Sequence, residues 1–175
     1  GEGDKFLGVI VPRVRSVVKE YRATDFETIT ELLTSPWHEV RLCGLLLLVD
    51  NYKQGDNTSR EEVFEYYLSN TDAINNWDLV DLSAPYIVGA YLVDRPAEDR
   101  QLLYRLANSH NLWEKRIAVV STIAFIRNND YEDILHLAEL LMQDSHDLMH
   151  KAIGWMLREV GKRNETVLRS FLDTH

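Results

Sequence analysis

Residues 76 to 81 place an indole and a carboxylate where they can act together. In "NWDLVD", Trp77 and Asp81 are four residues apart, so they are neighbours on one face of a helix. No Lys or Arg occurs between residues 74 and 91 to pair with the acid. An aromatic ring beside a carboxylate suits an organic cation, through cation-π attraction of roughly 0.5 to 2 kcal/mol together with Coulomb attraction.

Asp81 also interrupts a series of basic residues. Four apolar segments align so that one shared position is occupied in turn by Arg41, Asp81, Arg116 and Lys151, at separations of 40, 35 and 35 residues. A purely structural interaction would be expected to repeat in each segment, whereas Asp81 reverses the charge. This favours a functional role for Asp81. An ion pair between Asp81 and Arg116 is the structural alternative.

The elements that carry these residues are helices. Apolar residues recur at three- and four-residue spacing almost throughout, and no stretch alternates with period two for long, so the predicted fold class is all-α. Pro85 cannot donate a hydrogen bond to the Asp81 carbonyl and should kink its helix. The predicted helices are 11–22, 25–34, 36–53, 59–70, 76–92, 96–108, 112–128, 130–142, 145–161 and 164–174.

Local signals mark several helix starts. Ser35-Pro36 and Ser145 are interpreted as starts, and Asn111 with Glu114 has the spacing of a capping box. Longer and shorter helices alternate, as in a repeated two-helix unit. We call the longer ones inner helices and the shorter ones outer helices.

Helix pairs at this spacing are typical of HEAT-like repeats. Stacked pairs form a curved α-α superhelix, or solenoid, in which one set of helices lines the concave surface. We expect residues 1–175 to form a single HEAT-like repeat domain. It is expected to be incomplete at both ends, because the chain opens on an inner helix without its partner, closes on an outer helix and starts at Gly1 rather than methionine.

The composition fits one globular unit. The chain has 175 residues, of which 45% are hydrophobic and 27% charged, enough for a core of its own. Cys43 is the single cysteine and lies in an apolar run, which favours a core position and a cytoplasmic location. The longest apolar run, 45–49, is far shorter than the roughly 20 residues of a membrane span, so no membrane association is expected. Nothing indicates an obligate dimer, and we expect a monomer.

The net charge of -9 argues against a polyanionic partner until the charges are located. Four outer helices (25–34, 59–70, 96–108 and 130–142) hold 12 Asp and Glu against 3 Lys and Arg. The five inner helices hold more Lys and Arg than Asp and Glu. An inner surface of this charge suits a nucleic-acid backbone, and an acidic protein partner is the alternative.

All four tryptophans fall on inner helices. Trp37 and Trp113, close to helix starts, are interpreted as packing residues, whereas Trp77 and Trp155 are candidates for the site. His146 and His150 have a spacing that can chelate zinc, but no third ligand accompanies them, so we expect no metal. No Gly-rich phosphate loop or nucleophile elbow occurs, and no cofactor is expected.

Four segments resemble the DNA alkylation-repair glycosylases of the AlkD type, which are built from HEAT-like repeats. They are "KFLGVIVPRVR" (5–15), "NWDLVD" (76–81), "WEKRIAVV" (113–120) and "HKAIGWMLREVGK" (150–162), and the resemblance covers nearly the whole chain. It implies excision of cationic N3- and N7-alkylated purines from double-stranded DNA. A cationic base is already a good leaving group, so no strong general acid is needed.

The resemblance also implies roles for individual residues. Trp77, Asp81 and Trp155 would meet the lesion, with Asp81 stabilising the oxocarbenium-like sugar and positioning water. Lys and Arg residues would hold DNA phosphates. The predicted contacts are Arg41, Lys115, Arg116, Arg158, Lys162 and Arg163. The alternative function is a non-catalytic HEAT-repeat scaffold that binds a structured nucleic acid or an acidic protein.

Overall fold

The computed structural model describes residues 3–175. The described residues contain helices and one isolated bridge, between Lys5 and Trp37, but no strand. The prediction of an all-α fold is therefore confirmed. The chain divides into two compact units, Gly1–Ser83 (unit 1) and Ala84–His175 (unit 2). The expectation of a single repeat domain stays a prediction.

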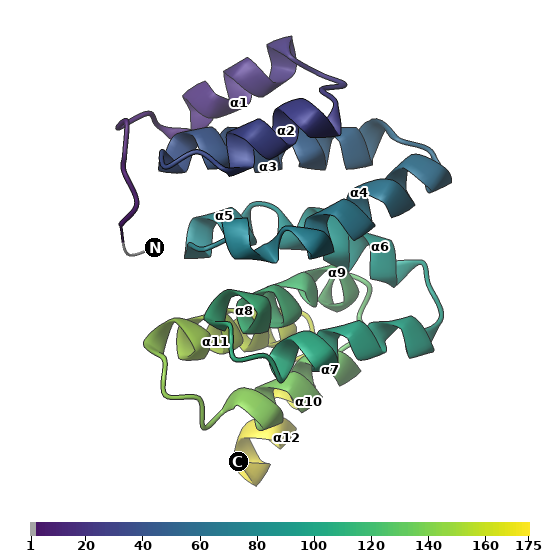
Figure 1. Ribbon diagram of the computed structural model, residues 1–175. Helices are drawn as coiled ribbons and strands as arrows, with labels where there is room; N and C mark the ends of the chain where they lie inside the picture. Colours follow the sequence, from purple (N-terminus) through teal and green to yellow (C-terminus); the bar gives the residue numbers. More distant parts are fainter. Residues whose placement is uncertain (1–2) are drawn as a thin grey trace. The chain divides into compact units, whose positions relative to one another are not determined.

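Unit 1 is organised around one long buried helix, α3. Its apolar run, Leu45–Val49, is buried throughout, so α3 can pack helices on several sides. It contacts α1, α2, α4 and α5, and Figure 1 shows α1 and α2 next to it. The elements of unit 1 are α1 (Val11–Glu20), α2 (Phe26–Leu33), α3 (His38–Gln54), α4 (Asn57–Ser69), the 3-10 turn η1 (Thr71–Ala73) and α5 (Trp77–Asp81).

Unit 2 is built on two central helices, α8 and α11, which pack against each other. Helix α8 also contacts α7 and α10, and α11 contacts α10 and α12. The elements are the π-helix η2 (Pro85–Gly89), α6 (Ala90–Val93), the 3-10 turn η3 (Ala97–Arg100), α7 (Gln101–Ala107), α8 (Leu112–Ser121), α9 (Ile123–Ile126), α10 (Glu132–Leu141), α11 (Asp147–Gly161) and α12 (Glu165–Thr174).

The predicted helix starts are partly confirmed. Asn111 caps α8, since its side chain accepts a hydrogen bond from the N–H of Trp113 at 2.9 Å. Ser35-Pro36 and Ser145 were wrong as starts. Helix α3 begins at His38, because Trp37 is extended and Lys5 forms main-chain hydrogen bonds with Pro36 and His38. Helix α11 begins after His146, whose ring nitrogen accepts from the N–H of Leu148.

The inner helix predicted over 76–92 is broken, as Pro85 requires. Helix α5 ends at Asp81, residues 82 and 83 form a turn, and a π-helix follows over Pro85–Gly89. The break places Asp81 in the last turn of a short helix. A carboxylate there gains nothing from the helix dipole, which favours cations at this end. Helix stability therefore does not explain why Asp81 is acidic.

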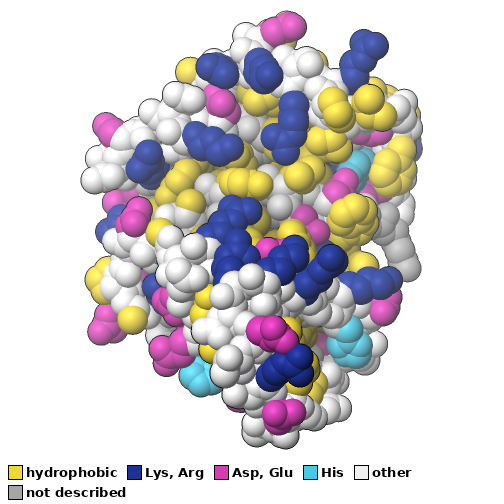
Figure 2. Space-filling view, turned by 180° about the vertical axis from the view of Figure 1, so that it is seen from behind, with side chains coloured by type: hydrophobic (Ala, Val, Ile, Leu, Met, Phe, Trp, Pro, Cys, Tyr) yellow, Lys and Arg dark blue, Asp and Glu magenta, His cyan; other side chains and the backbone are white. Residues whose placement is uncertain are grey.

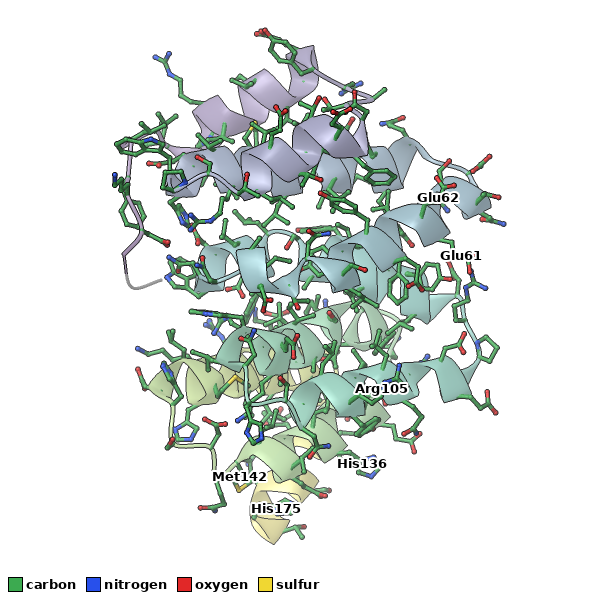
Figure 3. All side chains as sticks on the ribbon, viewed as in Figure 1. Glu61, Glu62, Arg105, His136, Met142 and His175 are labelled. Carbon is green, nitrogen blue, oxygen red and sulfur yellow. The ribbon has the colours of Figure 1, made fainter. Side chains whose placement is uncertain are left out.

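Outer helices carry exposed acids, as their composition indicates. Glu61 and Glu62 are both exposed, and Figure 3 shows them on α4 at the edge of unit 1. In unit 2, Glu139 on α10 accepts from the His175 ring at 3.0 Å, which ties the end of α12 to α10.

Candidate functional site

Helix α5 presents an indole and a carboxylate at the surface of unit 1. The Trp77 residue is 51% exposed, so the ring is available to a ligand, and Asp81 is partly exposed one turn later. Leu79 and Val80, on the other side of the helix, are fully buried. The pair predicted from the i, i+4 spacing is thus accessible on one side of a helix that is anchored on the other.

A buried polar cluster holds the N-terminal end of this helix. Arg41 is 5% exposed, and its guanidinium donates to Asp4 Oδ1 at 2.7 Å, Asn75 Oδ1 at 3.0 Å and the Ser35 carbonyl at 2.9 Å. Asn76 donates to the other Asp4 oxygen at 3.3 Å and caps the N–H of Trp77 at 2.8 Å. These bonds fix the chain just before the indole.

Arg41 therefore has a different role from the predicted one. Sequence register places it among DNA contacts, but its guanidinium is buried and already bonded to three acceptors. A buried, paired guanidinium is not offered to a phosphate. We correct this assignment: Arg41 is a positioning residue for α5.

His38 provides a second anchor. Its Nε2 lies 2.7 Å from Asp78 Oδ2, and Asp78 Oδ1 accepts from the N–H of Leu79 at 2.9 Å. His38 is buried, and Asp78 stands in the first turn of α5. The α3 helix thus holds α5 through a side chain adjacent to Trp77. Sequence reasoning missed His38 and Asp4, although the polar residues around Trp37 and Trp77 were a signal for them.

Behind Asp81 lies a buried hydroxyl pair. Tyr67 Oη and Ser83 Oγ are 2.9 Å apart, and Ser83 donates to the Leu79 carbonyl at 2.5 Å. Burial raises the pKa of Tyr67, and the negative charge of Asp81 raises it further. Tyr67 therefore stays protonated and can donate. The charge of Asp81 acts on the buried interior of unit 1 as well as at its surface.

The chain leading into α1 is held by one carboxylate. Glu39 accepts from the N–H groups of Leu7 at 2.8 Å, Gly8 at 2.8 Å and Val9 at 3.2 Å. Burial opposes ionisation of Glu39, but these hydrogen bonds outweigh it and lower the pKa of the carboxyl. Gly8 has φ of +77°, a conformation that glycine adopts without strain.

In unit 2, helix α11 exposes a second indole beside a cation. Trp155 is 36% exposed, and Arg158, three residues later, is exposed on the same side of the helix. Arg158 forms no ion pair with any residue that the structure describes. It lines a groove of about 550 Å³ together with Lys162, Leu168 and Leu172 of the α11–α12 pair. An exposed guanidinium without an ion-pair partner among the described residues is what a phosphate contact requires.

Lys162 and Arg163 share one acidic neighbour. Glu159 accepts from Lys162 Nζ at 2.5 Å and from Arg163 Nη1 at 3.0 Å, and these bonds lower the pKa of its carboxyl. Exposed pairs of this kind contribute little to stability. Lys162 is 53% exposed, so a phosphate can compete for it, and both residues remain candidates for DNA contact.

Arg116 and Lys115 are engaged within the protein. Arg116 is 4% exposed and donates to the Leu148 carbonyl at 2.7 Å. Lys115 pairs with Asp144 at 2.7 Å, which lowers the pKa of Asp144 and fixes the loop before α11. The structure does not support direct phosphate binding by either. Both instead position α11, which carries Trp155 and Arg158.

Neither a metal centre nor a membrane helix stands out in the part of the chain that the structure describes. No group of three or more His, Cys, Asp and Glu side chains gathers there in a way that could hold an ion. No helix among the described residues has the length and apolar character to cross a membrane. Cys43 is partly buried, and burial raises the pKa of its thiol.

Comparison with known proteins places this chain in a family. The model of a family described as DNA alkylation repair enzyme matches residues 1–175, so the chain belongs to that family. A solved structure described as a predicted DNA alkylation repair enzyme from Enterococcus faecalis has the same fold. The TM-score is 0.75 at 16% identity, over 99% of this chain and 83% of that one. Comparison with curated proteins gave no match.

Proposed function

We propose that this protein is a DNA glycosylase that releases cationic N3- and N7-alkylated purines from double-stranded DNA. Membership of a family of DNA alkylation repair enzymes supports the substrate class. The observation that carries the proposal is the accessible Trp77–Asp81 pair on α5. Its carboxylate is not explained by helix stability, and buried side chains of α3 hold its helix.

The chemistry needs one anion at the sugar. The bond between C1′ and the purine breaks, and its electron pair leaves with the base, which becomes neutral. The sugar acquires oxocarbenium character, and Asp81 stabilises this positive charge as it develops. Water attacks C1′ and loses a proton, which leaves an abasic site. Asp81 would also orient that water.

The other residues bind rather than react. Trp77 from unit 1 and Trp155 from unit 2 would pack against the deoxyribose and the cationic nucleotide, where an aromatic face attracts positive charge. Arg158, Lys162 and Arg163 would hold phosphates. Because these contacts are with the backbone and the charge of the lesion, extrusion of the base into a pocket is not required.

The test is release of free base by purified protein from a duplex that contains one N7-methylguanine. We expect Asp81→Asn to lower the single-turnover rate about 10²- to 10³-fold, the range typical of removing one electrostatic group. DNA affinity should be retained, because the change removes a negative charge from a DNA-binding surface. The rate is measured by chromatography of the released base and the affinity by fluorescence anisotropy.

The matched control is Asp72→Asn, which removes an exposed carboxylate from η1 in the same unit. It should release base at the wild-type rate. Equal release by wild type and Asp81→Asn would refute the catalytic role of Asp81. A wild-type protein that binds duplex DNA but releases no base would favour the scaffold function instead.

A further inference from the structure

Two buried hydroxyls lie at the turn that follows Asp81 and take no part in the proposed chemistry. Tyr67 on α4 and Ser83 are both fully buried, and their oxygens are 2.9 Å apart. Neither side chain reaches the molecular surface, one face of which Figure 2 shows, so neither can touch DNA directly. Buried hydroxyls call for a reason, because apolar side chains would fill the same space without needing a hydrogen-bond partner.

The Ser83 hydroxyl replaces a main-chain hydrogen bond where α5 ends. In a continuing α-helix, the N–H of Ser83 would bond the carbonyl of Leu79, four residues earlier. Here this N–H bonds the Val80 carbonyl at 3.1 Å, and the Leu79 carbonyl accepts from Ser83 Oγ at 2.5 Å. The serine side chain thus satisfies a carbonyl at the buried end of the helix.

The direction of the second hydrogen bond follows from the number of protons. A serine hydroxyl has a single proton, and that of Ser83 goes to the Leu79 carbonyl. Ser83 Oγ therefore accepts from Tyr67, and the Tyr67 O–H is the donor. Burial raises the pKa of Tyr67, which keeps this proton in place. We call this chain of hydrogen bonds, from Tyr67 through Ser83 to the Leu79 carbonyl, the hydroxyl relay.

Asp81 lies between the two residues of α5 and its turn that the hydroxyl relay joins. It is the last residue of α5, two positions after Leu79 and two before Ser83. Pro85 has no N–H to bond the Asp81 carbonyl, so the hydrogen bonds of α5 do not continue beyond this point. The buried cluster around Arg41 holds the start of α5, and the hydroxyl relay holds its end from the side of α4.

We propose that Tyr67 and Ser83 are positioning residues that hold the Asp81 carboxylate in place at the sugar, an inference that rests on the proposed function. A carboxylate stabilises developing positive charge best when it is oriented before the charge forms. A displacement of about 1 Å can lower a rate about 10²-fold, even when the substitution that causes it is far from the reacting atoms. The hydroxyl relay supplies this orientation from within unit 1.

The test compares single-turnover release of N7-methylguanine, at saturating protein, by wild type, Tyr67→Phe and Ser83→Ala. We expect each variant to lower the rate about 10- to 100-fold, while duplex affinity measured by fluorescence anisotropy stays within about twofold of wild type. The double variant should be no slower than Ser83→Ala alone, because the central member of the relay is already missing. Circular dichroism and thermal unfolding establish that each variant is folded.

A second comparison separates positioning from general support of the fold. In an Asp81→Asn protein, Tyr67→Phe should lower the residual rate by less than about twofold, because the hydroxyl relay acts through the carboxylate. A tyrosine that only stabilises the protein would lower the rate equally in both backgrounds. Tyr67→Phe leaves the bond from Ser83 to Leu79 intact, so this comparison remains as the test if Ser83→Ala does not fold.

The matched control is Tyr104→Phe, which removes a hydroxyl that donates to Asp133 at 2.9 Å in unit 2. It should keep the wild-type rate. The positioning role is refuted if Tyr67→Phe and Ser83→Ala match this control, or if Tyr67→Phe is equally damaging with and without the carboxylate at position 81. A wild-type protein that releases no base would refute the glycosylase and this inference with it. Wild-type release together with unaffected variants would refute the inference alone.

Discussion

Two arginines that were both predicted to bind DNA differ in burial and in partners. Arg41 is 5% exposed and bonded to Asp4, Asn75 and the Ser35 carbonyl. Arg158 is exposed on α11 and pairs with none of the described residues. Removing one partner of a buried ion pair leaves the other charge uncompensated, whereas removing an exposed cation does not.

We therefore expect opposite effects from two alanine substitutions. Arg41→Ala should lower the free energy of unfolding by about 3 to 5 kcal/mol, the cost of breaking a buried pair. Arg158→Ala should change it by less than about 0.5 kcal/mol and should weaken DNA binding instead. Urea unfolding and anisotropy measure the two effects. An Arg41→Ala protein of wild-type stability would contradict the positioning role.

The two arginines show which contacts residue spacing can predict, namely those within one helix, and which it cannot, namely those with distant residues. Trp77 and Asp81 are four residues apart on one helix, so their adjacency follows from helix geometry alone. The partners of Arg41 lie 37 and 34 residues away in the sequence. Repeat register assigns Arg41 a position in its helix but does not determine which distant side chains cover it. The sequence alone therefore could not predict that Arg41 is buried.

At the scale of elements, the helix positions were predicted well and the breaks only in part. The break after Asp81 follows from Pro85, whose missing N–H is visible in the sequence. The break between α8 and α9 at Thr122 was missed. There the Thr122 hydroxyl donates to the Val119 carbonyl at 2.6 Å, a hydrogen bond that competes with those of the helix backbone. The sequence does not show whether a threonine forms such a bond.

The contact between η2 and α8 gives a test of this packing. A Cβ at Gly89 would lie 2.3 Å from the Ser121 carbonyl oxygen, a backbone atom that cannot move aside easily. We expect Gly89→Ala to destabilise the protein by about 1 to 3 kcal/mol through overpacking.

The matched control for Gly89 is Gly154→Ala in α11. A Cβ at Gly154 would meet nothing within 4 Å, so helix propensity alone should make this variant more stable by about 0.5 to 1 kcal/mol. Thermal unfolding of both variants provides the measurement. Equal melting temperatures would show that the approach of η2 to α8 is not as close as described.

At the scale of the whole molecule, the net charge alone does not predict whether the protein can bind DNA. The chain carries a net charge of -9, yet many of its acids lie on the outer helices and the cations proposed to meet DNA lie on α11 or just after it. Sequence counting predicted this segregation because Asp, Glu, Lys and Arg can be counted for each predicted helix separately. It could not show which cations are neutralised, since ion pairs such as Lys115–Asp144 join residues 29 positions apart.

The salt dependence of DNA binding tests the sum of these contacts. If Arg158, Lys162 and Arg163 each meet one phosphate, the slope of log K against log salt should be about -2.5 to -3. The affinity should then fall about 30- to 60-fold between about 50 and 200 mM salt, by the same relation. Titration of an undamaged duplex at several salt concentrations measures the slope. A flat dependence would favour a protein partner over DNA.

The Glu39 anchor has a consequence for how this sequence can diverge. Glu39 binds residues 7 to 9 through hydrogen bonds from their main-chain N–H groups. These hydrogen bonds therefore do not restrict which side chains replace Leu7 and Val9, as long as the main-chain N–H remains. Proline, which has no N–H to donate, is barred from all three positions. A single acid 32 positions after Leu7 thus restricts which residues this segment can carry, because it binds the main chain.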